Sequence, residues 1–409
     1  MSVKKIKEYY NSNAFIKRLG PGIITAALVF GPGSLTINTK LGASYGYSLL
    51  WVLILAMLFM SAFTSMSAKI GLTSSVSFIE RIKTELGKPI AIIVGLGVFL
   101  TTASFQAGNT IGASVAFSEF FTTSTPLILW IALFSCATIF LLFFESFYEI
   151  LEKLMIGLVL LMLISFLLTI LMAFSNPIDL LKGLVPSVPK GSEYLIISLT
   201  ASSFSIVGAF YQSYLVREKG WEIQEEKSCI QESRTGIITL GLLSTMVMIC
   251  AGSVLHQNNT EVKSASDLSM ALEPLFGSFT SKAFMIGFFS ASFSSMIGNA
   301  TIGGVILSDT FFSDSKLSSL RVRMMIMLVI VIGAIVATIF GALPLQLIIF
   351  AQGITIMIVP LSAIIILLFA NSKNMPTALK NKKYLNSVGV LGIAVLLLMS
   401  IYSINYLLF

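Results

Sequence analysis

The stretch that decides the fold is TAALVFGPGSLTINT, residues 25–39, in which Gly31-Pro32-Gly33-Ser34 interrupts an apolar run. Two glycines around a proline weaken a helix and remove one backbone donor, so the stretch predicts a helix break. In hydrocarbon, unpaired backbone groups are too costly unless they line a cavity or bind something. We therefore expect a membrane helix that unwinds at mid-depth to serve a function.

The composition places the chain among polytopic helical membrane proteins. Of its 409 residues, 56% are hydrophobic and 11% are charged, and the mean hydropathy is +0.92. A soluble domain of this size could not cover its surface with so few charges. The net charge of +7 does not indicate nucleic-acid binding, because the basic residues lie in short loops between apolar segments. Cys136, Cys229 and Cys250 match no disulfide or metal motif, and the charged N-terminus does not resemble a secretory signal.

Eleven apolar segments are long enough to cross a bilayer. They are residues 15–39, 45–70, 89–117, 125–144, 154–174, 194–216, 235–255, 283–309, 321–341, 344–371 and 386–408. With the N-terminus inside, 21 of the 26 Lys and Arg residues fall on the cytoplasmic side. The positive-inside rule then predicts a multi-pass protein of the cell membrane with a cytoplasmic N-terminus and an external C-terminus.

A second interruption lies in span six, LTASSFSIVGAFYQSYL at residues 199–215. Broken helices five spans apart suit a five-plus-five inverted repeat with the substrate between the halves. The predicted organisation is a tail at 1–14, a core at 15–371 with repeats at about 15–174 and 194–371, and a loop with helix eleven at 372–409. The alternative is that both sites are ordinary kinks, which is harder to sustain for Gly31-Pro32-Gly33-Ser34.

Beyond these breaks, the chain resembles the Nramp family of divalent-metal transporters. The resemblance covers about residues 15–405 and is strongest in LGPGIITAALVFGPGSLTINTKLGASYGYSLLWVLILA, residues 19–56. YEILEKLM (148–155), VREKGW (216–221) and AQGITIMIVP (351–360) are also similar to the family. The resemblance implies an all-α, LeuT-like fold with helices one and six discontinuous, and transport by alternating access.

The residues at the family's metal site depart from its pattern. In metal-transporting members the first break reads Asp-Pro-Gly-Asn, and the resemblance implies that its Asp and Asn bind metal. Gly31 and Ser34 stand at those positions here. The family's methionine and histidine in span six fall on Ser205-Ile206-Val207, and a second family histidine falls on Gln212.

The family's proton path also departs from its pattern. The acids that the family carries in span three fall on Gln106 and Asn109, whereas Gln352 in span ten keeps a family glutamine. The 19 acidic residues and the one histidine all lie in tails, in loops or near segment ends. Transition metals prefer carboxylate, imidazole and sulfur ligands, so transport of Mn or Fe ions by the family mechanism is not expected.

Neutral hydroxyls and amides at the starts of half-helices favour a small anion, with bicarbonate or a small carboxylate first. The expected substrate-binding residues are Gly31, Gly33, Ser34, Ser202, Ser203, Ser205, Gly208 and Gln352. A possible pathway, or former proton path, comprises Gln106, Asn109, Tyr211 and Gln212.

Two other functions stay open. One is a carrier of divalent metal cations, either a hydrated Mg-type ion whose water shell would excuse the missing ligands, or a Mn-type ion. The other is a membrane sensor that binds without transporting. An enzyme is not expected, because the sequence shows no nucleophile–base pair, nucleotide loop or metal cluster. No cofactor or nucleic-acid partner is expected; the expected partners are the lipid bilayer and a coupling ion such as Na or H.

Overall fold

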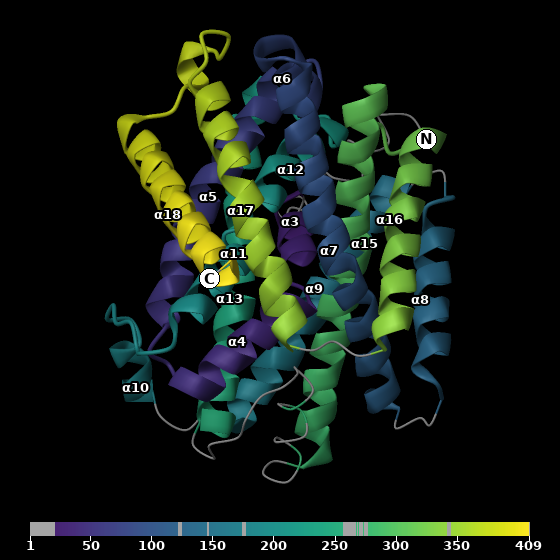
Figure 1. The fold of residues 1–409 in the computed structure, drawn as a ribbon, viewed down its shortest axis with the longest axis vertical. Coiled ribbons are helices and arrows are strands. Elements are labelled where there is room, and N and C mark those ends of the chain that lie inside the picture. Colours follow the sequence, from purple (N-terminus) through teal and green to yellow (C-terminus); the bar gives the residue numbers. More distant parts are fainter. Residues whose placement is uncertain are drawn as a thin grey trace.

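A computed structural model describes residues 21–121, 125–144, 147–173, 177–256, 277–341 and 345–408, together with Asp267, Ser269 and Glu273. The elements in this part of the chain are all helical (Figure 1). They are α3 (Pro21–Val29), α4 (Pro32–Tyr45), α5 (Leu50–Thr73), α6 (Phe78–Leu86), α7 (Lys88–Phe120), α8 (Leu127–Leu141), α9 (Phe147–Ala173), α10 (Pro177–Lys182), α11 (Glu193–Ser203), α12 (Ile206–Glu218), η1 (Ile223–Glu225), α13 (Glu226–Ala251), η2 (Gly252–His256), α15 (Ser278–Phe312), α16 (Leu320–Phe340), α17 (Leu345–Ala370), η3 (Thr377–Leu379) and α18 (Lys383–Leu408).

The break predicted in span one is confirmed. Helix α3 ends at Val29, α4 begins at Pro32, and the two axes are bent by 66°. Gly31 is extended at the N-cap position, and Pro32 takes the first helical position, where a missing N–H costs nothing within its own helix. The predicted segment 15–39 is therefore two helices, of which the second runs on to Tyr45.

The break predicted in span six is also confirmed. Helix α11 ends at Ser203 and α12 starts at Ile206, slightly before the start expected near Val207-Gly208. The Ser205 hydroxyl caps α12 by accepting a hydrogen bond from the Gly208 amide at 3.2 Å. Both discontinuous helices of the LeuT-like fold are thus present.

Eight helices of the described chain are long and apolar enough to cross a membrane, and the α3–α4 pair can form a ninth, broken span. Two shorter apolar helices are Leu127–Leu141, which is α8, and the Val359–Ala370 segment of α17. The count of eleven spans therefore stays a prediction. One boundary differs clearly, because α9 begins at Phe147 rather than near residue 154, and it includes Glu149 and Glu152.

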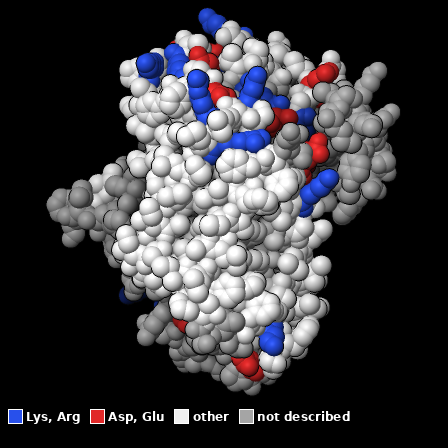
Figure 2. All heavy atoms as spheres, turned by 90° about the vertical axis from the view of Figure 1, so that its right-hand side faces the viewer, with Lys and Arg blue, Asp and Glu red and all other residues white. Residues whose placement is uncertain are grey.

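The broken helices lie inside the bundle. Helix α15 and the α11–α12 pair are buried over 78% of their apolar windows, against 28% for α18. Helix α15 packs against α7, α9, α16 and α3, and α12 packs against α5 (Figure 1). The outer helices expose apolar side chains such as Ile339 and Leu398, as lipid-facing surfaces do. Figure 2 shows an uncharged middle band, with charges gathered mainly at the end that carries α6.

Helix α3 lies in direct backbone contact with α13. A Cβ added at Gly236 would come 1.8 Å from the Gly22 carbonyl oxygen, and one at Gly22 would come 1.9 Å from the Glu232 carbonyl oxygen. No side chain fits between these two helices, so the pair of glycines sets how closely the first half of the broken helix can pack.

We predict that Gly236→Ala lowers the free energy of unfolding by about 1–3 kcal/mol, because one methyl group forces the two backbones apart. The measurement is the thermal melting temperature in detergent. Gly157→Ala in α9 is the matched control, since a Cβ there meets nothing within 4 Å. Equal melting temperatures for the two variants would contradict the close approach.

Candidate functional site

A cavity lies where the two broken helices face each other. Its empty volume is about 540 Å³, part of it open to solvent. Walls come from the α3–α4 break, the α11–α12 break, α7, α15 and α17. The polar lining residues are Ser34, Thr101, Asn109, Ser202, Ser205, Ser295, Asn299 and Thr355, and the lining glycines are Gly31, Gly33 and Gly208.

Pro32 leaves a carbonyl without its helical partner. The Leu28 carbonyl would accept from the amide of residue 32 in a continuous helix, but proline has no N–H. Helix α15 supplies the missing donors. The Ser295 hydroxyl lies 3.1 Å from both the Ala27 and the Leu28 carbonyl oxygens, and the Asn299 amide nitrogen lies 3.3 Å from the Leu28 oxygen.

The amide nitrogens around the cavity point to backbone carbonyls. Asn299 Nδ2 also donates to the Ser295 carbonyl at 3.1 Å, and Asn109 Nδ2 donates to the same carbonyl at 3.2 Å. Because a carbonyl oxygen only accepts, the nitrogen of each amide must be the atom that faces it. The Oδ1 atoms of Asn109 and Asn299 are then the amide atoms available to a substrate.

Two cavity hydroxyls are oriented in the same way. Ser34 donates to the Val29 carbonyl at 3.2 Å, and Ser202 donates to the Leu199 carbonyl at 2.9 Å. A hydroxyl has one hydrogen, so once that hydrogen is bonded to the backbone only its lone pairs can face the cavity. Ser34 and Ser202 therefore present acceptors to the cavity, whereas Ser205, which accepts from the Gly208 amide, keeps its hydrogen.

The structure brings together most of the residues expected at the substrate. Gly31, Gly33, Ser34, Ser202, Ser205 and Gly208 line the cavity, and so does Asn109, which was expected only on a pathway. Ser203 is buried but is not part of the lining. The side chain of Gln352 lies outside the described residues, although Thr355, on the same helix, lines the cavity.

The contribution of α15 was missed. SASFSSMIGNA, residues 290–300, carries four serines and one asparagine within an otherwise apolar helix. Ser295 and Asn299 are four residues apart and therefore share one helix face. This polar face in span eight could have indicated that the helix contributes to the cavity, but no glycine–proline break marks it.

The other pathway candidates hold helices together. Gln106 donates to the Met296 carbonyl at 3.0 Å and packs against Gly333. The side-chain oxygen of Gln212 accepts from Thr25 at 2.5 Å, and its nitrogen donates to Ser233 at 3.0 Å, which joins α12 to α3 and α13. Tyr211 is buried and stacks on Tyr214. None of Gln106, Tyr211 and Gln212 is part of the cavity lining.

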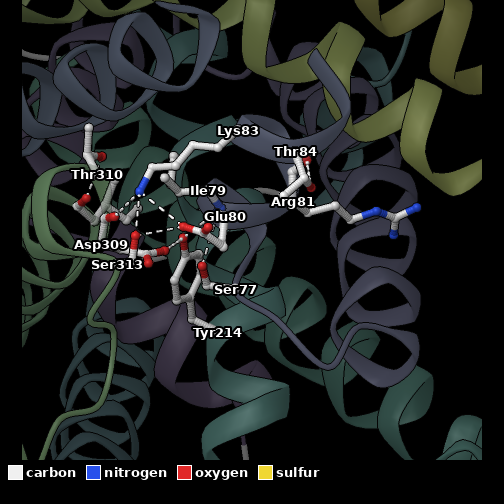
Figure 3. A network of polar contacts seen from close by, with 11 residues as sticks. Ser77, Ile79, Glu80, Arg81, Lys83, Thr84, Tyr214, Asp309, Thr310 and Ser313 are labelled. Atoms are coloured by element: carbon white, nitrogen blue, oxygen red, sulfur yellow. Dashed lines mark hydrogen bonds and ion pairs between the residues drawn. The ribbon is translucent and has the colours of Figure 1, made fainter. Parts of the chain in front are cut away.

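A polar network closes the charged end of the bundle (Figure 3). The Tyr214 hydroxyl of α12 donates to Asp309 Oδ2 of α15 at 2.7 Å and accepts from the Ile79 amide of α6 at 3.2 Å. Lys83 of α6 donates to the Asp309 carbonyl and to the Ser313 hydroxyl, both at 2.9 Å. These bonds tie α6, α12 and α15 to one another.

Glu80 completes this network. Its Oε2 accepts from Ser313 at 2.8 Å and from Lys83 at 3.1 Å. The Ser313 hydroxyl, followed by the Lys83 ammonium, holds the pKa of the Glu80 carboxyl below its ordinary value. The ionised carboxylate therefore stabilises the fold above the ordinary pKa, and this contribution is lost as the pH falls through the lowered one.

Together, the all-helical membrane bundle, its two broken helices and the cavity between them define a LeuT-fold integral membrane protein of the transporter kind. The family model described as natural resistance-associated macrophage protein-like matches residues 22–405. The chain belongs to the Nramp family.

Curated relatives and solved structures agree with this assignment. The divalent metal cation transporter MntH of Staphylococcus saprophyticus is 25% identical and covers 94% of this chain and 91% of its own. The MntH of Deinococcus radiodurans is 24% identical over 91% of this chain and 85% of its own. A manganese transporter from Eremococcus coleocola superposes with a TM-score of 0.81 at 18% identity, over 96% of this chain and 86% of that one.

These findings overturn the expectation of a small-anion substrate such as bicarbonate, because the relatives are named as transporters of divalent metal cations. The physical reason is the direction in which the hydroxyl and amide hydrogens of the cavity point. The sequence analysis treated the cavity hydroxyls and amides as donors, but Ser34, Ser202 and Asn299 give their hydrogens to backbone carbonyls. An anion would meet lone pairs at these groups.

We predict that Tyr214→Phe lowers the free energy of unfolding by about 1–3 kcal/mol, since it leaves Asp309 and the Ile79 amide each without one buried partner. Thermal melting in detergent measures the effect. Tyr402→Phe in the exposed part of α18 is the control. Equal melting temperatures for the two variants would mean that the Tyr214 hydrogen bonds do not stabilise the fold.

Glu80→Gln is expected to flatten the acid dependence of stability. The wild type should melt at a higher temperature than the variant near neutral pH, and this difference should shrink as the pH falls below the ordinary carboxyl pKa. Melting curves of both proteins across an acid pH series measure it. If the difference in melting temperature between wild type and variant grew toward low pH, the expected pH dependence of the Glu80 contribution would be wrong.

Proposed function

We propose that this protein is a secondary transporter of a divalent metal cation, and that the ion crosses while it keeps much of its water shell. The observation that carries the proposal is the orientation of the cavity's polar groups. The waters of a hydrated cation present O–H donors outward, and the lone pairs of Ser34, Ser202 and Asn299 are acceptors for them.

The chemistry of the lining supports a hydrated ion. Among the described residues, no group of three or more His, Cys, Asp or Glu side chains could hold a metal. Neutral oxygens are ligands for hard cations such as Mg²⁺, which dehydrates reluctantly and usually keeps several waters.

The relatives support the cation class, since they are named divalent metal cation transporters. The ligand set of this chain separates it from a carrier of bare Mn²⁺, because Gly31 and Ser34 cannot replace lost coordination waters with charged ligands. We place Mg²⁺ first among the candidate cargoes and Mn²⁺ second.

The transport cycle we propose is alternating access between two repeats of about 15–174 and 194–371, with the segment 372–409 outside them. The gathering of Lys and Arg at the end that carries α6 (Figure 2) supports placing that end, with the N-terminus, in the cytoplasm. The Tyr214 network then lies on the cytoplasmic side of the cavity. Sodium or protons are candidate coupling ions.

Uptake into proteoliposomes tests the proposal. We expect saturable Mg²⁺ uptake, weaker Mn²⁺ uptake and no bicarbonate uptake. Ser202→Ala should lower Mg²⁺ uptake at subsaturating concentration about fivefold, as the loss of about 1 kcal/mol from one hydrogen bond predicts. Ser403→Ala, a buried serine of α18 away from the cavity, is the control.

Two results would contradict the proposal. One is that folded protein in the liposomes moves none of Mg²⁺, Mn²⁺ and Ca²⁺. The other is that Mn²⁺ uptake exceeds Mg²⁺ uptake and is insensitive to Ser202→Ala, which would mean a bare ion bound elsewhere in the protein.

A further inference from the structure

Gly31 sits against the side chain of Ser295. A Cβ built on Gly31 would come 2.7 Å from Ser295 Oγ, 2.9 Å from Ser295 Cβ and 3.1 Å from Asn109 Oδ1. Real Cβ contacts essentially never fall below 3.0 Å. Any residue larger than glycine at position 31 therefore requires Ser295 to move.

Ser295 is held where it is. Its side chain is fully buried, and its hydroxyl lies within hydrogen-bond distance of the Ala27 and Leu28 carbonyls, which the break at Pro32 leaves without helical donors. Rotating the side chain away would leave the Ala27 carbonyl with only the Ser294 hydroxyl, at 3.1 Å, and the Leu28 carbonyl with only the Asn299 amide, at 3.3 Å. The space beside Gly31 is thus blocked by a group that also completes the backbone of the broken helix.

We infer that Ser295 is a specificity-determining residue: it excludes a side chain at position 31 from the cavity and so keeps the site neutral and the cation hydrated. This inference rests on the proposed function for its cargo, but its geometry does not. It also assigns to α15 a part in selectivity that the breaks in the other two helices do not reveal.

The exclusion of a side chain by Ser295 explains why position 31 is a glycine. The resemblance implies an aspartate at this position in metal-transporting members, and a carboxylate on position 31 would lie at the cavity wall beside Ser34 and Asn109. Restoring an acid at position 31 alone should fail here, because the blocking serine comes from another helix. The two positions should therefore behave as a coupled pair.

The test is a double-mutant cycle read by calorimetric titration with Mn²⁺ and by melting temperature. Gly31→Asp alone should lower the melting temperature and create no Mn²⁺ site. Gly31→Asp with Ser295→Gly, in which Asn299 still bonds the Leu28 carbonyl, should fold and bind Mn²⁺ at least tenfold more tightly than the wild type. Ser295→Gly alone should gain no Mn²⁺ site.

Ser295→Ala is the matched control, because it removes the hydroxyl but keeps the Cβ at 2.9 Å. It should rescue Gly31→Asp less than Ser295→Gly does. A smaller cycle with Gly31→Ala keeps the inference testable where the aspartate variants do not fold. Its expected result is a melting-temperature loss that Ser295→Gly reduces.

Tight Mn²⁺ binding by Gly31→Asp alone at wild-type melting temperature would overturn the inference. Independent effects of the two substitutions in both cycles would also overturn it. These readouts do not depend on transport, so a wild type that carries no divalent cation would refute the proposed function and leave the coupling of Gly31 with Ser295 standing.

Discussion

The Leu28 carbonyl has no partner in its own helix, and much of the site follows from that. Proline at position 32 cannot donate to it, so Ser295 and Asn299 of α15 must. This demand fixes the face that α15 turns toward the broken helix and the direction of the Asn299 amide. It also leaves no room beside Gly31.

The cation that we propose as substrate is inferred from bonds of the same kind. A wall of hydroxyls and amides is neutral in composition, yet it becomes an acceptor surface when its hydrogens point into the backbone. Ser202 does this within α11, and Ser34 does it across the break, to the last residue of α3. Asn109 and Asn299 do it toward the neighbouring helices α15 and α3. Residue types alone therefore could not decide between an anion and a hydrated cation.

The sequence predicted those features of the fold that depend on residues adjacent in the chain. Gly31-Pro32-Gly33 breaks any helix, and Ser205 before Ile206 is a helix cap, so both breaks could be located. The partners of the pathway candidates Gln106 and Gln212 could not be predicted, because Met296, Thr25 and Ser233 come from other helices. Ser295 was missed for the same reason, since its role depends on an unpaired carbonyl 267 positions earlier in the chain.

Helix α12 carries Gly208 at the cavity and Tyr214 at the Asp309 network on one uninterrupted rod. Six residues at about 1.5 Å each separate the two by about 9 Å. A rod this short does not bend appreciably, so any tilt of α12 at its Ser205 end would displace Tyr214 at the other end. The cavity wall and the Asp309 network are therefore joined by one rigid element.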